Sequence, residues 1–195
     1  PPNLEISEGV NFERVAGLLA AGHIIARIAG RCEFGARALG NRSILADPSR
    51  QQSVKRINEA IKNRDFWMPF AISILNDKAS RFIKNPKNIS AGFMSMAFDT
   101  EPKNYDKILA GTHLYDHTVR PQYVYRETNP EYYDLISAFN SKTGIPALLN
   151  TSFNLHGDPI VNTIEDAMTT FVNSGIDYLF VNDYFLIKKN DRNLC

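Results

Sequence analysis

Residues 23–48 have the sequence HIIARIAGRCEFGARALGNRSILADP, and this stretch carries the strongest local signals in the chain. The segment His23 to Ala29 is mostly apolar, which is typical of a buried strand, and Gly30 ends it. Next come fourteen residues, GRCEFGARALGNRS, with three glycines and three arginines. Asp47-Pro48 then combines an N-cap acid with a proline at the first helical position. The stretch predicts a strand, a loop rich in arginine and glycine, and a helix in succession.

Four helices are predicted from apolar spacing and capping signals. They begin at Asn11, at Asp47-Pro48, at Asn129-Pro130 and at Thr163, where Asp166 completes a capping box. The second helix carries Val54, Ile57 and Ile61 on one face, and glycines mark the ends of the other three: Gly22, Gly144 and Gly175.

Further strands are predicted where short apolar runs are bounded by turn residues. They cover residues 70–75, 91–98 and 145–149, and two final strands flank a hairpin turn at Asn182-Asp183. Residues 76–120 are polar and irregular, which indicates surface loops. The expected fold class is α/β or α+β, with a mixed sheet covered by helices.

Composition limits the class of protein. The 195 residues fit one domain, residues 1–195, and 44% apolar content excludes global disorder. A net charge of +1 argues against nucleic-acid binding by bulk electrostatics. No apolar run is long enough for a membrane helix, and two cysteines, Cys32 and Cys195, fit a reducing cytoplasm. Because the chain starts at Pro1-Pro2 without Met, we expect a domain of a longer polypeptide.

The arginine- and glycine-rich loop is the leading candidate for chemistry. Arg31, Arg37 and Arg42 occur with one acid, Glu33, directly after a strand. Guanidinium groups bind phosphate through two hydrogen bonds, and glycines let backbone N–H groups approach an anion. The loop lacks the pattern of a Walker A motif and of a dinucleotide fingerprint. It therefore predicts an anion site of another kind.

Three other segments add polar groups of the same kind. Lys62 and Arg64 follow a helix, although cations also occur there simply to complement the helix dipole, and Arg120 precedes a proline. Asn150, Thr151 and Ser152 supply amide and hydroxyl groups, or else cap their own turn. His113, Asp116 and His117 are too loosely spaced to predict a metal site. The residues predict an anion site but no reaction.

These segments resemble the C-terminal domain of the O-carbamoyltransferases that modify antibiotics and nodulation factors. The family pattern is roughly GRxEFGPRALGxRSILADP, an IKxRE/D segment before PFAPSIL, DxTxRPQ, and NTSFNxxGEPIV. This chain has GRCEFGARALGNRSILADP, IKNRDFWMPFAISIL, DHTVRPQ and NTSFNLHGDPIV in the same order. The resemblance extends from about residue 22 to residue 188.

The resemblance implies a YrdC-like fold that follows an N-terminal Kae1-like domain. It implies that the YrdC-like domain makes carbamoyl adenylate from carbamoyl phosphate and ATP with Mg²⁺. The Kae1-like domain, which holds the family's metal, would then transfer the carbamoyl group to a hydroxyl. By motif position, the catalytic and ligand-binding residues would be Arg37, Lys62, Arg120 and Ser152, with Asn150 and Thr151 beside the ligand. Supporting roles would fall to Arg31, Glu33, Arg42 and Arg64.

Three positions depart from the family pattern: Ala36 and Ile72 replace prolines, and Met68 replaces an arginine. Two other functions therefore remain open. One is a YrdC-like module that binds nucleotide or RNA without chemistry, although the net charge of +1 makes nucleic acid an unfavoured partner. The other is a scaffold domain with a decayed site.

Overall fold

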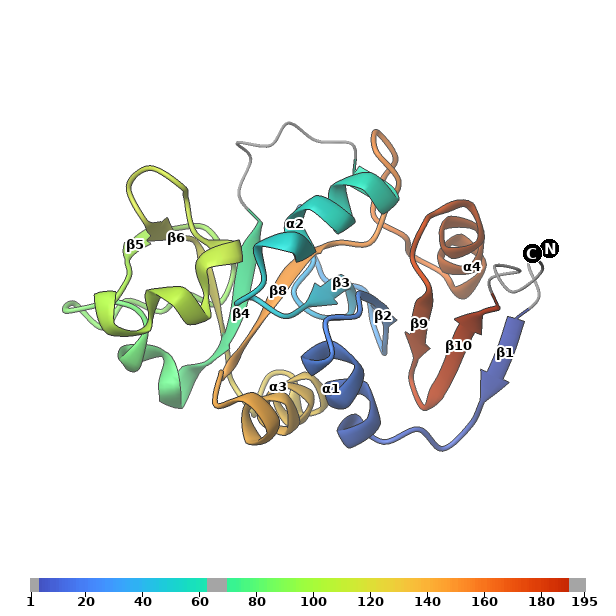
Figure 1. The fold of residues 1–195 in the computed structure, drawn as a ribbon, viewed down its shortest axis with the longest axis horizontal. Helices are drawn as coiled ribbons and strands as arrows, with labels where there is room; N and C mark the ends of the chain where they lie inside the picture. The colour runs from blue at the N-terminus through green and yellow to red at the C-terminus, as the bar shows by residue number, and fades with distance from the viewer. Residues whose placement is uncertain (1–3, 63–69, 190–195) are drawn as a thin grey trace.

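The computed structural model describes residues 4–62 and 70–189, which fold around an eight-stranded mixed sheet (Figure 1). Its strand order is β1-β10-β9-β2-β3-β8-β4-β7, in which the pairs β2–β9 and β4–β7 are parallel and the others antiparallel. The strands are β1 (Leu4–Ser7), β2 (Ile25–Ile28), β3 (Arg42–Ala46), β4 (Ala71–Leu75), β7 (Pro121–Val124), β8 (Ala147–Ser152), β9 (Tyr178–Val181) and β10 (Tyr184–Lys188). A small second sheet pairs β5 (Phe98–Asp99) with β6 (Thr118–Val119).

Helices cover the large sheet on both sides. Figure 1 shows α1 (Phe12–Ala20) and α3 (Pro130–Thr143) together below the sheet, with α2 (Gln51–Ile57) and α4 (Ile164–Asn173) above it. A π-helical turn, η1 (Asn58–Lys62), extends α2, and the short 3₁₀ turns are η2 (Asn76–Arg81), η3 (Pro102–Lys107) and η4 (Leu109–Gly111). No helix among the described residues is long and apolar enough to cross a bilayer.

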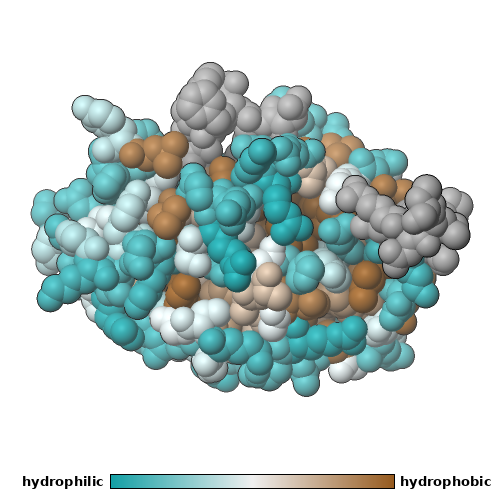
Figure 2. Space-filling view, viewed as in Figure 1, coloured by the Kyte–Doolittle hydropathy of each residue, from teal (hydrophilic) through white to brown (hydrophobic). Residues whose placement is uncertain are grey.

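The core lies between these layers and is one continuous cluster of buried apolar side chains. The central strands β2, β3 and β4 are buried along their whole length. Ile72 of β4, one of the departures from the family pattern, is fully buried between β7 and β8. The face in Figure 2 is largely hydrophilic around its margin, with hydrophobic residues visible between the polar ones. The burial of this continuous apolar cluster provides the main driving force for the fold.

The mixed α/β class is confirmed, and so are the strongest local signals. Asn11 and Asn129 cap α1 and α3 through their side chains, and Thr163 forms the predicted capping box with Asp166. Gly144 ends α3 in the left-handed conformation, with φ of 73°. The hairpin also forms, because Val181 of β9 pairs with Tyr184 of β10 around the predicted turn.

Several predicted elements are wrong in position. The predicted strand over residues 91–98 is a turn region in which only Phe98 joins a strand, because Met94 adopts a positive φ of 54°. The second helix begins at Gln51, since the Asp47 carboxylate accepts hydrogen bonds from Ser49 and Arg50 in a turn before it.

The polar middle of the chain is not a set of surface loops. Its short turns pack Ala79, Phe82, Ile83, Ile108 and Ala110 into the core, each at most 3% exposed. The same segment contributes the strands β5 and β6, so its irregular backbone carries buried side chains that helical or strand periodicity does not detect.

Candidate anion-binding site

A small pocket lies at the edge of the large sheet where β8 ends and where β3, β4 and β7 begin. The loop between β2 and β3 supplies its other wall. The pocket has about 380 Å³ of atom-free space including its open mouth. Its lining residues are Ala36, Arg37, Ala38, Phe70, Ala71, Met94, Arg120, Asn150, Thr151 and Ser152. Five of the residues predicted from sequence as a ligand site are therefore brought together.

Two arginines give this pocket its positive charge. Arg37 is exposed on the loop, and the described residues offer its guanidinium no hydrogen bond or ion pair. Arg120 is half-buried and immediately precedes β7. No acidic residue lines the pocket among the described residues. Two guanidinium groups that line one pocket favour an anionic ligand there.

Beneath the loop is a buried polar cluster formed by Ser73, Gln122 and Asn150. The Ser73 hydroxyl donates to Gln122 Oε1 at 2.6 Å, and Asn150 Nδ2 donates to Ser73 Oγ at 2.8 Å. Gln122 Nε2 donates to the carbonyl oxygen of Leu39 at 2.7 Å, and Asn150 Nδ2 donates to that of Ala38 at 3.2 Å. The cluster thus anchors the part of the loop that follows Arg37.

Glu33 and Arg42 hold the two ends of the same loop. Glu33 Oε1 accepts hydrogen bonds from the backbone N–H groups of Leu39, Asn41 and Arg42. The buried Arg42 guanidinium donates to four carbonyl oxygens, those of Ala29, Gly30, Asn41 and Asn162. Both side chains form hydrogen bonds with backbone groups, and neither lines the pocket. Arg31 is exposed, and its carbonyl oxygen accepts from Asn41 Nδ2.

A buried arginine that the sequence did not indicate connects the loop to α3. Arg27 of β2 is 1% exposed and donates to the Gly40 carbonyl oxygen at 2.7 Å and to Glu131 Oε2 at 3.2 Å. Burial lowers the pKa of Arg27, and the nearby ring of Tyr132, 5.6 Å from the guanidinium carbon, favours its charged form. A charged residue inside an otherwise apolar strand is the sequence signal that could have revealed this support.

The end of β8 is ordered by Asn154, a residue of the NTSFNLHGDPIV motif to which the sequence assigned no role. Ser152 Oγ donates to Asn154 Oδ1 at 2.7 Å. Asn154 Nδ2 in turn donates to the carbonyl oxygens of Leu155 and Asp158. The strand β8 therefore runs three residues beyond its predicted end at residue 149, and it positions Asn150, Thr151 and Ser152.

Other predicted groups lie elsewhere or are outside the described residues. The backbone of Lys62 ends η1, but its side chain, Arg64 and Met68 are outside the described residues. His113 Nδ1 and Asp116 Oδ1 are 3.0 Å apart on an exposed loop, and hydrogen bonds from Thr118 lower the pKa of Asp116. No group of three or more His, Cys, Asp or Glu side chains that could hold a metal occurs among the described residues.

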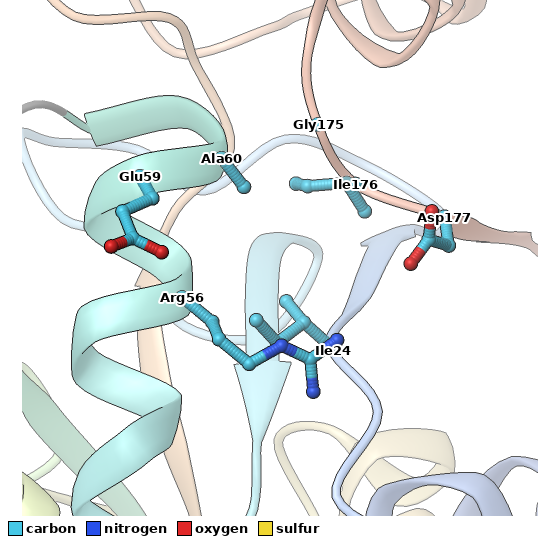
Figure 3. A pocket seen from close by; sticks show the side chains of 7 residues that line it. All are labelled: Ile24, Arg56, Glu59, Ala60, Gly175, Ile176 and Asp177. Carbon is cyan, nitrogen blue, oxygen red and sulfur yellow. The ribbon is translucent and has the colours of Figure 1, made fainter.

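A second hollow lies between the α2–η1 segment and the connection from α4 to β9 (Figure 3). Arg56 and Glu59 project from the helical side, and Ile176 and Asp177 lie opposite. The Arg56 guanidinium donates to the Gly22 carbonyl oxygen at 2.7 Å. Two carboxylates beside one engaged arginine make this hollow unfavourable for an anion.

The structure is that of a mixed α/β domain with an arginine-lined pocket, and comparison with known proteins supplies the family. The chain belongs to the carbamoyltransferase family: the family model "Carbamoyltransferase C-terminus" matches residues 16–188. It is 43% identical over 180 residues to nodulation protein NolO of Bradyrhizobium diazoefficiens, covering 92% of this chain and 32% of that protein. It is 32% identical over 178 residues to the 3'-hydroxymethylcephem-O-carbamoyltransferase of Amycolatopsis lactamdurans, covering 91% of this chain and 33% of that protein.

The predicted YrdC-like fold is confirmed by solved structures. Full-length HypF in a phosphate- and nucleotide-bound form has a TM-score of 0.57 at 14% identity, over 96% of this chain and 22% of HypF. A Sua5 variant from P. abyssi has a TM-score of 0.57 at 16% identity, over 87% of this chain and 48% of Sua5. At such low identity the likeness concerns the fold alone. The chain spans about a third of the length of the two curated relatives.

Proposed function

We propose that this chain binds carbamoyl phosphate and ATP and forms carbamoyl adenylate. The observation that carries the proposal is the pocket that holds Arg37 and Arg120 together with the polar end of β8. Membership of the carbamoyltransferase family supports the carbamoyl group as the unit transferred. Carbamoyl phosphate is a small dianion, which matches a small pocket that contains two guanidinium groups.

Each group has a chemical role in this proposal. Arg37 and Arg120 would bind the phosphate oxygens and stabilise the charge that develops as phosphate leaves. The Ser152 hydroxyl, already oriented by Asn154, would position the ligand and not act as a nucleophile. Lys62, by its place in the family motif, would add a third cation.

We place the nucleoside of ATP in the neighbouring hollow on the far side of the loop. Its lining includes the apolar and aromatic side chains of Leu39, Phe93, Tyr123 and Tyr125, together with Glu33. A largely apolar wall with a few polar groups is typical of sites for small organic ligands. The HypF neighbour, described as phosphate- and nucleotide-bound, supports nucleotide binding by analogy of fold. Mg²⁺ would arrive on the ATP phosphates and neutralise part of their charge.

The overall reaction balances with one water. Water cleaves carbamoyl phosphate to carbamate and inorganic phosphate, and a carbamate oxygen then attacks the α-phosphorus of ATP and displaces pyrophosphate. Since this chain covers about a third of its relatives' length, we assign transfer to a hydroxyl to an additional Kae1-like domain, which would hold the family's metal. The name of the cephem relative, an O-carbamoyltransferase, supports a hydroxyl acceptor.

Calorimetric titration tests the proposal directly. Carbamoyl phosphate is added to the purified protein, with and without a non-hydrolysable ATP analogue and Mg²⁺. Arg37→Ala and Arg120→Ala each remove a charge-assisted hydrogen bond, so we expect each to weaken binding by about 1.5–3 kcal/mol, roughly one to two decades in affinity.

Arg126→Ala is the matched control, because Arg126 pairs with Asp134 on the surface and does not line the pocket. Its affinity for carbamoyl phosphate is expected to equal that of the unaltered protein. Unchanged affinity in both pocket variants would refute the site. A folded protein that binds no carbamoyl phosphate would refute the function and favour a decayed site.

A further inference from the structure

We infer that Asn150 selects the amino group of the ligand, so that the pocket favours carbamoyl phosphate over acetyl phosphate. In this arrangement Asn150 Oδ1 accepts a hydrogen bond from the carbamoyl NH₂ while the arginines bind the phosphate. The inference rests on the proposed function. It adds that Asn150 Oδ1 is the atom that recognises the NH₂ group of the ligand.

The position of Asn150 restricts what its side chain can do. It lies in β8, is 1% exposed, and lines the pocket beside Thr151 and Ser152. Its strand neighbours across the sheet are Leu45 and Ala71. A buried amide on a central strand cannot turn to solvent, so both of its ends need partners inside the protein or on a ligand.

Three neighbours settle the orientation of the amide. Its nitrogen lies 2.8 Å from Ser73 Oγ, 3.2 Å from the Ala38 carbonyl oxygen and 3.4 Å from Gln122 Oε1. Two of those three atoms are carbonyl-type oxygens that carry no hydrogen, so only the NH₂ end of Asn150 can face them favourably. The Asn150 oxygen therefore has to point away from this polar cluster.

That oxygen is the buried, unpaired acceptor of a residue that lines the pocket together with two arginines. Asn150 Oδ1 is buried and has no hydrogen-bond partner among the described residues. Arg37 and Arg120 can only donate. A ligand with only phosphate oxygens would leave Oδ1 unpaired, whereas a ligand that joins a phosphate to an NH₂ group would satisfy both sets of atoms.

The same geometry explains how an isosteric ligand would be rejected. Acetyl phosphate has the same charge and nearly the same shape as carbamoyl phosphate, but it places a methyl group where the NH₂ group would be. A methyl group donates no hydrogen bond, so the acetyl ligand would bury Oδ1 without a partner. Sites built to hydrogen-bond a substrate N–H discriminate strongly against analogues that lack it.

The test uses two stable phosphonates that differ only at this position: phosphonoacetamide, with NH₂, and acetonylphosphonate, with CH₃. Calorimetric affinities of both are measured on the unaltered protein and on Asn150→Leu, which keeps the side-chain size. We expect the unaltered protein to prefer the amide by at least about tenfold, equivalent to about 1.4 kcal/mol. In Asn150→Leu the ratio should fall close to one, with the affinity for acetonylphosphonate retained.

A second variant keeps the test decisive if Asn150→Leu fails to fold. Asn150→Ala also removes Oδ1 and adds no larger group to the buried site, so the ratio of the two affinities should again fall close to one. Equal binding of both phosphonates by the unaltered protein would overturn the inference and leave the anion site intact. A preference retained in folded Asn150→Leu would overturn it as well. Failure to bind either phosphonate, carbamoyl phosphate or inorganic phosphate would instead overturn the proposed function.

Discussion

Gly40→Ala adds one methyl group at the point where the arginine-bearing loop rejoins the core. Gly40 has a φ of 118° and is buried, with its N–H donating to Ser43 Oγ and its carbonyl accepting from Arg27. A Cβ atom at this position would overlap the ring of Tyr132. Because Tyr132 is fully buried, its ring has no open space into which it can move.

Two separate costs follow from this geometry. Placing a residue with a side chain at this φ costs about 1–3 kcal/mol in backbone strain. Forcing an extra methyl group into packed surroundings costs about 1–3 kcal/mol more. The expected loss in the free energy of unfolding is therefore about 2–6 kcal/mol, and each kcal/mol lowers the melting temperature of a domain of this size by about 2–4 °C.

Gly35→Ala in the same loop separates the two costs. Gly35 has a similar φ of 126°, but no atom lies within 4 Å of the position of an added Cβ. It should lose only the strain contribution, about 1–3 kcal/mol. Urea unfolding followed by circular dichroism measures both variants. If Gly40→Ala is no less stable than Gly35→Ala, the packing of the loop against Tyr132 is not as described.

Two further predictions concern helices. Gly17→Ala, inside α1 with no atom within 4 Å of the new Cβ, should raise the unfolding free energy by about 0.5–1 kcal/mol, and lowered stability in urea would contradict the open environment. Hydrogen bonds from the backbone N–H groups of Thr163 and Asn162 lower the pKa of Asp166. Its stabilising effect is thus complete above the unfolded pKa of about 3.9 and is lost as pH falls through the lower folded value. The difference in melting temperature between the protein and Asp166→Asn should shrink on acidification, and a difference independent of pH would refute the capping role.

Local signals predicted the helix ends well because capping is decided within a few residues. Asn11, Asn129 and the Thr163–Asp166 box each satisfy N–H groups that any helix leaves unpaired at its start. The helix start predicted at Asp47-Pro48 was wrong for an equally local reason. The Asp47 carboxylate accepts hydrogen bonds from Ser49 and Arg50 in a turn that precedes the helix.

The strands were predicted less well because pairing partners are distant in sequence. The sequence did not predict β1, β3 or β7. Their partners β10, β8 and β4 are distant in sequence, so the residues of each strand do not reveal its pairing. The first of these strands has exposed residues at its centre. Short strands buried on both faces lack the alternation that marks a half-buried strand.

The candidate site shows the same division. The motifs pointed to Arg37, Arg120 and residues 150–152, and the fold brings these residues into one pocket. They contain Ser73, Gln122 and Asn154 without assigning them a role, and they do not include Arg27; these four residues support the loop and the end of β8. Outside any motif, Arg27 is recognisable in sequence only as a charged side chain inside an apolar run.

By itself, the sequence determined the family, the mixed α/β class and the helix boundaries marked by caps, because long motifs and local hydrogen bonding depend on neighbouring residues. Only the tertiary structure decided which polar atoms share a pocket and which are already engaged. The unpaired Asn150 oxygen depends on Ser73, Ala38 and Gln122, which are far from it in sequence, meeting its amide nitrogen. Such an arrangement arises from strand pairing and burial, which act between distant parts of the chain.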